Sequence, residues 1–339
     1  MAAIARTEER LAPAEPGQLA QTWRRFKKHR LGLVGLGTII LLVLSVIVVP
    51  MISPFTYDEL DPEALVPDSR PGRNLESNFA YKPAMWDAPM SGKMHYLGTD
   101  AVGRDNLTRL FYGGRISLLV GLTAMLVVVS IGTIVGSLAG FYGGWVDTIL
   151  MRFVDLLLSL PTLPILLVVS KMLDQSGALK NTLGRDAGTV VTIIVVLSLF
   201  GWLGISRLVR GSILSLRSLD FIEATRALGA SNRRIILRHL MPNSMAPIIV
   251  AATLAVGDFI ITESFLSFLG LGIQEPVPSW GNLLQGGQEN AAFITTFDPT
   301  QDVRGFLILF PGFLILLTVL SINFMGDALR DALDPRLKM

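Results

Sequence analysis

The chain of 339 residues contains no cysteine, and its three histidines, His29, His95 and His239, lie far apart in the sequence. The absence of cysteine excludes disulfides, thiolate metal ligands and a cysteine nucleophile. The scattered histidines argue against a histidine-based metal site or proton relay. Charged residues make up only 17% of the chain, against about 25% in a typical soluble protein. Together these shortages disfavour a soluble enzyme.

Motifs of catalysis and nucleotide binding are missing as well. The chain has no G-x-x-x-x-G-K-[ST] loop, no H-E-x-x-H helix and no G-x-S-x-G elbow. Without a P-loop, the backbone cannot cradle nucleotide phosphates in the P-loop manner. We therefore expect no enzymatic activity, no bound cofactor and no metal site in this chain. Any energy for active work would have to come from another subunit.

Apolar residues, in contrast, form 51% of the chain and gather in long uninterrupted runs. About 20 helical residues span a hydrocarbon core of about 30 Å. The first run is longer than a signal-peptide core of about 7–15 residues, so we interpret it as a retained anchor. The pattern predicts an all-α integral membrane protein with six transmembrane helices. The six runs cover residues 31–52, 116–141, 148–170, 189–206, 244–270 and 306–325.

The charges between the runs predict which side of the membrane each segment occupies, because short segments rich in lysine and arginine stay in the cytoplasm. Residues 1–30 carry a net charge of +4 and residues 207–243 a net charge of +5, whereas residues 53–115 carry −2. We therefore predict that both termini are cytoplasmic. The predicted organisation is a cytoplasmic segment (1–30), a first span (31–52), an extracytoplasmic loop (53–115), a five-helix core that includes the 207–243 loop (116–326) and a cytoplasmic tail (327–339).

The cytoplasmic segment ends in an amphipathic pattern. Leu19, Trp23 and Phe26 are spaced as one face of a helix, and basic residues fill most of the positions between them. Such a pattern is typical of a helix that lies in the membrane interface. The same basic residues would also serve as the positive flank of the first span, and both interpretations stay open.

Small residues and prolines punctuate the apolar runs. Gly132 and Gly136, followed by Gly140, form a ridge of small residues four apart, which predicts a close helix contact. We favour a contact within the chain over a contact with a second membrane subunit. Prolines remove a backbone donor and kink helices. The prolines that predict kinks here are Pro161, Pro164 and Pro247.

Three carboxylates, Asp155, Asp258 and Glu263, lie within the apolar runs. A charge in hydrocarbon is costly, so each must be paired, neutralised, close to an interface or facing an aqueous cavity. Asp258 and Glu263 are weak candidates for lining a translocation path. The alternative is a structural hydrogen bond, which we favour for Asp155 because it lies near the end of its run.

The basic loop after the fourth run contains signals for two short helices. Asp220 and Glu223 have the spacing of a capping box, so we expect a helix to begin at Asp220. Gly229 can take the left-handed conformation that ends this helix, Ser231 can cap the next, and Pro242 is expected to stop it. The predicted helix pair has an apolar ridge with basic flanks, which suits a docking surface. The basic residues of its second helix are Arg233, Arg234, Arg238 and His239.

The loop also matches a known pattern. It reads Glu223-Ala224-Thr225, three residues, Gly229, nine residues, His239-Leu240-Met241-Pro242. This resembles the EAA loop of ABC importer permeases, whose pattern is Glu-Ala-Ala, three residues, Gly, nine residues, Ile, any residue, Leu, Pro. Thr225, His239 and Met241 depart from it. In that family the loop inserts into a groove of the ATPase subunit, so the resemblance implies mechanical coupling. The residues it implicates are Asp220, Glu223, Ala224, Thr225, Gly229, Arg233, Arg234, His239 and Pro242.

Three further stretches, residues 95–118, 140–147 and 323–336, resemble the C-type permease of dipeptide and oligopeptide importers. The resemblance implies a type I ABC importer permease fold in a prokaryotic plasma membrane. It also implies a homologous second permease, two cytoplasmic ATPase subunits that bind ATP and Mg²⁺, and an extracytoplasmic solute-binding protein. Residues 56–94 fit no pattern that we recognise.

Two alternatives to a peptide importer remain. The same architecture could import nickel or another small solute, because the spans do not separate these cargoes. A secondary transporter or channel would be favoured by inverted repeats, broken helices in matching halves and paired intramembrane charges, none of which is convincing here. Membrane lipid is the other expected partner, and no nucleic acid is expected.

Overall fold

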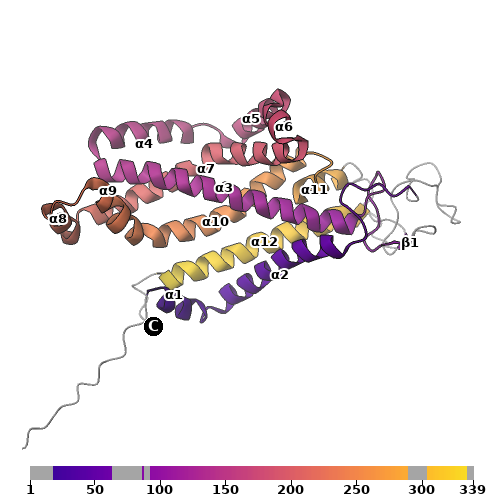
Figure 1. Ribbon diagram of the computed structural model, residues 1–339, viewed down its shortest axis with the longest axis horizontal. Coiled ribbons are helices and arrows are strands. Elements are labelled where there is room, and N and C mark those ends of the chain that lie inside the picture. Colours follow the sequence, from indigo (N-terminus) through magenta and orange to yellow (C-terminus); the bar gives the residue numbers. More distant parts are fainter. Residues whose placement is uncertain (1–17, 63–85, 88–91, 289–303, 334–339) are drawn as a thin grey trace, which may run out of the picture.

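The computed structural model describes residues 18–62, 86–87, 92–288 and 304–333, which form an elongated bundle of helices (Figure 1). Five helices are long and apolar enough to cross a membrane, and one bent pair supplies a sixth span. In a membrane, helices of this kind satisfy their own backbone hydrogen bonds, which explains why the long apolar runs fold as helices. The prediction of an all-α protein with six spans is confirmed.

The long helices are α2 (Arg30–Ile52), α3 (Asn106–Tyr142), α7 (Arg185–Arg217), α10 (Met241–Phe268) and α12 (Arg304–Leu333). The bent pair is α4 (Gly144–Leu158) and α5 (Thr162–Ser176). The shorter helices are α1 (Gln18–Phe26), α6 (Ala178–Leu183), α8 (Asp220–Ala227), α9 (Asn232–Ile235), the π-helix η2 (Ile236–Leu240) and α11 (Trp280–Gln288). Two short strands, β1 (Trp86–Asp87) and β2 (Met94–His95), pair antiparallel with Trp86 opposite His95.

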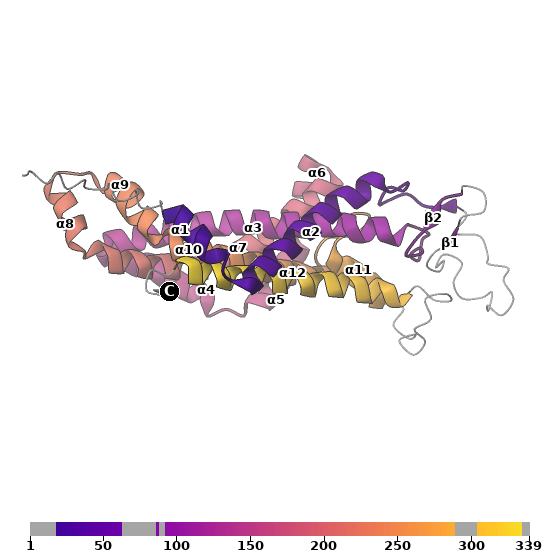
Figure 2. The ribbon, with the colours of Figure 1, turned by 90° about the horizontal axis from the view of Figure 1, so that it is seen from below.

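The bundle has two distinct ends (Figure 2). At one end lie α1, α8, α9 and the last turn of α12, and we call it the α8 end. At the other lie β1, β2 and the start of α3, and we call it the β end. Residues 18–30 and 207–243, which belong to the two basic segments predicted to be cytoplasmic, therefore share the α8 end. Which end faces the cytoplasm stays a prediction.

The centre of the bundle is the contact between α3 and α7. A side chain on Gly132 would lie 2.7 Å from Cβ of Ile205, and one on Gly140 would lie 2.9 Å from Cβ of Ile213. A side chain on Gly136 would overlap the backbone oxygen of Ser206. The glycine ridge therefore packs within the chain, as favoured from the sequence. Without side chains on the ridge, the two helices approach almost backbone to backbone.

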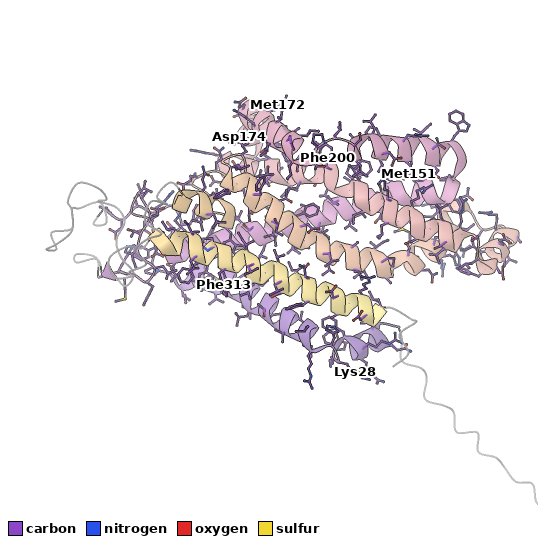
Figure 3. The ribbon with its side chains drawn as sticks, turned by 180° about the vertical axis from the view of Figure 1, so that it is seen from behind. Lys28, Met151, Met172, Asp174, Phe200 and Phe313 are labelled. Atoms are coloured by element: carbon purple, nitrogen blue, oxygen red, sulfur yellow. The ribbon has the colours of Figure 1, made fainter. Side chains whose placement is uncertain are left out.

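The third span is broken. Helices α4 and α5 meet at 87° across a gap of three residues that ends in Pro161. Met151 of α4 packs against the main core, whereas Met172 of α5 has 64% of its surface exposed (Figure 3). The kink predicted at Pro161 is confirmed, and Pro164 lies in the first turn of α5. Pro247, by contrast, lies inside the uninterrupted helix α10 and ends no helix.

Helix α1 packs against the end of α12. Phe26 is buried in a small cluster with Ala328 and Ala332, and its ring stacks on Trp23 at a centroid distance of 5.7 Å. His29 caps α2 by accepting a hydrogen bond from the backbone N–H of Gly32 (3.1 Å). The amphipathic helix predicted before the first span is therefore present. The end of α12 lies well beyond residue 325, where the last apolar run was predicted to stop.

The β end is closed by a buried histidine between two carboxylates. His95 Nδ1 lies 2.9 Å from Asp105 Oδ1, and His95 Nε2 lies 3.0 Å from Asp61 Oδ2. Asp105 is also the N-cap of α3, because it accepts from the backbone N–H of Thr108 (2.8 Å). The ring of Phe55 stacks on His95 at 4.1 Å. These contacts tie the segment after α2 to the first turn of α3.

The tight contact between α3 and α7 leads to a prediction about stability. Replacing Gly136 by valine should lower the free energy of unfolding by about 1–3 kcal/mol, because a close-packed contact must open. Gly204 is a matched control, since it lies in α7 with open space around its Cα. Thermal unfolding of purified Gly136→Val and Gly204→Val should show a Tm below that of the parent for Gly136→Val only. Equal Tm values would mean that the contact is looser than described.

The buried histidine leads to a second prediction. Burial lowers the pKa of His95, but hydrogen bonds and the charges of Asp105 and Asp61 outweigh it, so the pKa is raised. Protonation of His95 therefore stabilises the fold fully below the unfolded pKa of about 6.5, and this stabilisation is lost as pH rises through the folded pKa. Between about pH 6 and pH 9, the Tm of the parent should fall more steeply than that of His95→Gln. If the Tm of the parent and that of His95→Gln changed equally with pH, His95 would be neutral in the folded protein.

Candidate functional site

The motif identified in the sequence lies on a pair of short helices at the tip of the α8 end (Figure 2). The pair is held to the bundle by three side chains with no exposed surface, Ile222, Ile235 and Leu240, which belong to the main core. Around these anchors Ala230 and Ile236 pack partly against the core, and most of the other residues are exposed. The pair is therefore a rigid projection whose outer surface is open to a partner.

Gly229 makes the turn between the two helices. Its φ of +81° lies in the left-handed region, where a side chain is strained. Its N–H donates to the carbonyl of Arg226 (2.9 Å), and the N–H of Ala230 donates to the carbonyl of Thr225 (3.3 Å). This pair of hydrogen bonds is a Schellman motif, which satisfies the last carbonyls of α8. The helix end predicted at Gly229 is confirmed.

Three details of the predicted helix pair are wrong or incomplete. Helix α8 begins at Asp220 as predicted, but its N-cap is Leu219, which has extended backbone angles and makes no side-chain cap, so Asp220 is the first helical residue and no capping box forms. Ser231 occupies the N-cap of α9 but makes no side-chain cap hydrogen bond. Pro242 does not stop the second helix, which continues through η2 into α10.

The π-helical turn explains how the helix passes Pro242. Proline has no N–H to donate to the carbonyl four residues earlier, and its ring crowds that carbonyl. The N–H of Met241 instead donates to the carbonyl five residues earlier, at Ile236, which is π-helical bonding. Asn243 also donates through its side chain to the carbonyl of His239 (2.6 Å). The result is one continuous helix from Asn232 to Phe268.

The structure leaves most of the implicated side chains accessible. Thr225 is half-buried and donates to the carbonyl of Phe221 (2.6 Å), and His239 is also half-buried. The exposed apolar surface is formed by Phe221, Leu228 and Leu237, which are 42%, 89% and 56% exposed. Phe221 and Leu228 belong to the apolar side expected for the first helix, whereas Ile235 and Leu240, expected on the second, are buried.

The exposed residues of the motif are Asp220, Glu223, Ala224, Gly229, Arg233, Arg234 and Pro242.

The two weak candidates for a path differ sharply in surroundings. Glu263 is completely buried and accepts hydrogen bonds from Ser117 of α3 (2.9 Å) and from Ser267 of α10 (2.8 Å). Ser117 in turn accepts from the backbone N–H of Trp280 at the start of α11 (3.2 Å). Glu263 therefore joins α3, α10 and α11, and the structural interpretation fits it better than a position on a path.

Asp258 lies on the opposite face of α10 and is exposed, although it is near the middle of a membrane-spanning helix. Its neighbours one and two turns further along, Ile261 and Phe265, are also exposed. Asp155 forms an ion pair with Arg207 of α7, which agrees with the structural interpretation favoured from the sequence. Asp258 is thus the intramembrane carboxylate that is exposed and has no ion-pair partner among the described residues.

Helix α11 and the polar groups around it were not predicted. The nine residues of α11 are too few and too rich in glycine and glutamine to register as an apolar run. Arg109 is nearly completely buried in the first turn of α3, seven residues before the predicted start of that span. A buried arginine needs acidic partners, and those come from loops that only the fold brings together.

Comparisons with known proteins agree with the motif. The family described as binding-protein-dependent transport system inner membrane component matches residues 132–339, and the N-terminal transmembrane domain of oligopeptide transport permease C matches residues 17–71. The chain is 37% identical over 313 residues to the oligopeptide transport system permease protein OppC of Haemophilus influenzae, covering 92% of this chain and 87% of that protein. It is 40% identical over 316 residues to the dipeptide transport system permease protein DppC of Bacillus subtilis, covering 93% and 85%.

Among solved structures, an inward-facing MetNI methionine ABC transporter is similar with a TM-score of 0.49 and 20% identity, covering 66% of this chain and 96% of that chain. The sequence matches alone carry the family assignment, because one family covers more than half of the chain and the relatives are aligned over most of their length. This chain therefore belongs to the family of binding-protein-dependent transport system inner membrane components.

Proposed function

We propose that this chain is the membrane-spanning permease subunit of an ATP-driven importer of dipeptides or oligopeptides. The observation that carries the proposal is the EAA-type spacing on a rigid helix pair that projects from the α8 end. The two relatives described above are named for oligopeptide and dipeptide transport, which supports a peptide cargo over nickel. The chain supplies no nucleotide chemistry in this scheme, and its part is mechanical.

Coupling follows from the continuity between the helix pair and the bundle. An ATPase that binds α8 and α9 and then changes conformation would move the helix that runs without interruption from Asn232 to Phe268. Ile222 and Ile235 lock the pair to the core, so a displacement is passed on instead of being absorbed in the loop. A rigid-body movement of α10 relative to a second permease would open and close a path between them.

The proposed path runs along the exposed face of α10. A carboxylate at the centre of a bilayer costs about 2.5–3.5 kcal/mol on insertion scales, and such groups usually face water or a partner. Asp258 is exposed on this face, so we place the aqueous path there, between this chain and a homologous second permease. Asp258 would favour cationic groups, such as the ammonium end of a peptide.

The remaining partners follow from the same proposal. Two cytoplasmic ATPase subunits would bind ATP and Mg²⁺ and receive the α8–α9 pair, one for each permease. A solute-binding protein would deliver the peptide at the β end. Both chain termini would then be cytoplasmic in a prokaryotic plasma membrane, because α1 and the end of α12 lie at the α8 end.

A substitution at Gly229 tests the coupling role. An aspartate there is strained by about 1–2 kcal/mol, since Gly229 has a left-handed backbone, and it adds a carboxylate to the docking surface. We expect Gly229→Asp to reach the membrane in normal amounts, to lose most co-purifying ATPase subunit, and to abolish ATP-dependent tripeptide uptake into proteoliposomes.

Gly211→Asp is the control for this experiment, because it places the same side chain on an exposed glycine of α7 with open space around it. The control should retain ATPase binding and uptake. Purified alone, the parent chain should hydrolyse no ATP. Normal assembly and uptake by Gly229→Asp would remove the α8–α9 pair as the docking element, and the absence of peptide uptake by the parent assembly would refute the proposed function itself.

Orientation is testable with single cysteines, because the chain has none of its own. Tyr96 is 52% exposed at the β end, and Leu228 is 89% exposed at the α8 end. In intact cells an impermeant maleimide should label Tyr96→Cys, whereas Leu228→Cys should be labelled only after lysis. The reverse pattern would invert the proposed topology.

A further inference from the structure

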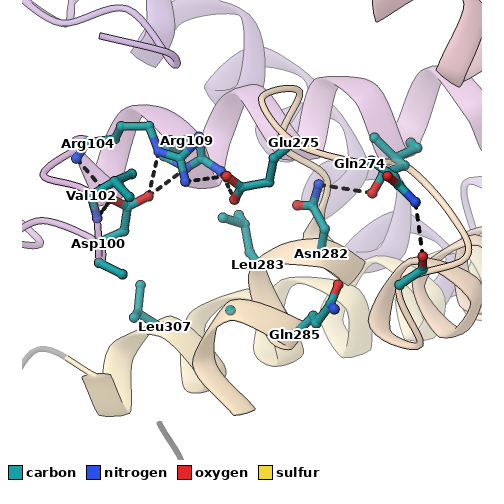
Figure 4. A pocket seen from close by; sticks show the side chains of 14 residues that line it. Asp100, Val102, Arg104, Arg109, Gln274, Glu275, Asn282, Leu283, Gln285 and Leu307 are labelled. Carbon is teal, nitrogen blue, oxygen red and sulfur yellow. Dashed lines mark hydrogen bonds and ion pairs between the residues drawn. The ribbon is translucent and has the colours of Figure 1, made fainter. Parts of the chain in front are cut away.

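A cavity of about 460 Å³ lies at the β end, beside α11 (Figure 4). Ligand pockets of proteins typically measure about 300–1,000 Å³. The walls come from the loop before α3, the first turn of α3, the loop between α10 and α11, α11 itself and the start of α12. We call it the mouth pocket. None of its lining residues belongs to the coupling motif or to the exposed face of α10.

Two buried arginines converge on the mouth pocket. Their side chains, Arg104 and Arg109, are only 9% and 1% exposed. Arg109 donates to the backbone oxygen of Tyr57 (3.0 Å), whereas its buried Nε has no hydrogen-bond partner among the described residues and lies 3.5 Å from Asp100 Oδ2. Buried guanidinium groups need anionic partners, and their planar donors suit carboxylates.

Two acidic residues neutralise this pair, and they are held very differently. Asp100 accepts from the backbone N–H groups of Val102 (3.0 Å) and Arg104 (2.9 Å), and also pairs with Arg104 Nε at 2.7 Å. These contacts within one turn fix Asp100 in place. Glu275 comes from the loop between α10 and α11, and its side chain is 56% exposed. Its oxygens lie 2.6 Å from Arg104 Nη2 and 3.0 Å from Arg109 Nη2.

Glu275 is therefore the carboxylate that can leave. The carboxylate of Glu275 is more than half exposed, so water can hydrate it as it rotates away, whereas the two guanidinium groups stay buried and need a replacement anion. Its departure would leave two buried arginines facing one carboxylate, Asp100. A carboxylate from a ligand would restore neutrality in the geometry that Glu275 now has, bridging both guanidinium groups.

The rest of the lining suits a small amphipathic ligand. Leu283 and Leu307 provide apolar contact, and Gln285 provides an amide (Figure 4). Asn282 is already engaged, because its amide donates to the carbonyls of Ile273 (3.2 Å) and Val277 (2.8 Å). It shapes the wall instead of binding. A carboxylate site beside an apolar wall matches the carboxyl end of a short peptide.

We propose that the mouth pocket binds the C-terminal carboxylate of a short peptide, and that Glu275 occupies the carboxylate position until the peptide displaces it. This inference rests on the proposed function for its ligand, and it adds a binding site within this chain at the end where a solute-binding protein would deliver cargo. Glu275 acts as an internal competitor, so removing its charge should strengthen peptide binding.

Calorimetry on the assembled transporter in lipid nanodiscs, without the solute-binding protein, tests this site with tri-alanine and with tri-alanine amide. Glu275→Gln should bind tri-alanine about fivefold more tightly than the parent, because its side chain no longer competes as an anion for the two guanidinium groups. The amide should bind to neither. Adding Arg104→Gln to Glu275→Gln should abolish the gain while Tm stays within the range of the single variants.

Glu59→Gln is the matched control, because Glu59 is an exposed carboxylate at the same end, pairs with Lys93 at 3.2 Å and does not line the pocket. It should bind tri-alanine as the parent does. Equal binding of peptide and amide, or no gain in Glu275→Gln, would overturn the proposal. The proposal would also be overturned if Glu275→Gln changed the affinity for the solute-binding protein but not for tri-alanine. The carboxylate that replaces Glu275 would then come from the solute-binding protein and not from a peptide. Tripeptide uptake by the parent assembly, measured separately, reports on the proposed function.

Discussion

The contact between α3 and α7 is the constraint on which the other parts of this molecule depend. Lipid tails are as apolar as leucine, so helices in a membrane gain little from hiding apolar surface and must gain from close packing. Gly132, Gly136 and Gly140 make that closeness possible, because a side chain at any of them would meet α7. The paired helices then serve as a frame: α3 contacts α2, α4, α10 and α11, while α7 contacts α5, α6 and α8.

Buried polar networks and buried aliphatic contacts hold opposite ends of the protein. At the β end, His95, Glu263 and Arg109 are buried and held by partners from several elements. At the α8 end, the only deeply buried contacts of the helix pair are aliphatic, through side chains such as Ile222 and Ile235. Close aliphatic packing holds the helix pair without directional bonds, whereas hydrogen bonds fix the geometry at the β end.

The apolar runs were sufficient to predict the spans, because a long apolar segment in lipid must satisfy its own backbone hydrogen bonds and therefore folds as a helix. Hydropathy marks the part of a helix that lies in hydrocarbon, and a helix can extend beyond that part. The apolar run therefore did not include the first turns of α3, where Asn106 and Arg109 are polar but buried by residues from other elements. The motif spacing located the α8–α9 helix pair, and Gly229 located its turn. Exposure could not be predicted: Asp258 and Glu263 are five residues apart on α10, and only the positions of α3, α7 and α12 around that helix decide which one is enclosed.

The π-helical turn between α9 and α10 has a consequence for the direction in which the helix pair points. Each residue of an α-helix advances about 100° around the axis, so the extra residue of a π-turn offsets everything beyond it by that angle. Deleting one residue between Ile236 and Leu240 would remove this offset. Because α10 is clamped by its neighbours, the rotation would fall on α9 and turn the outer surface of the α8–α9 pair about a quarter of the way around. The turn that carries the helix past Pro242 thus also sets the direction in which the pair points.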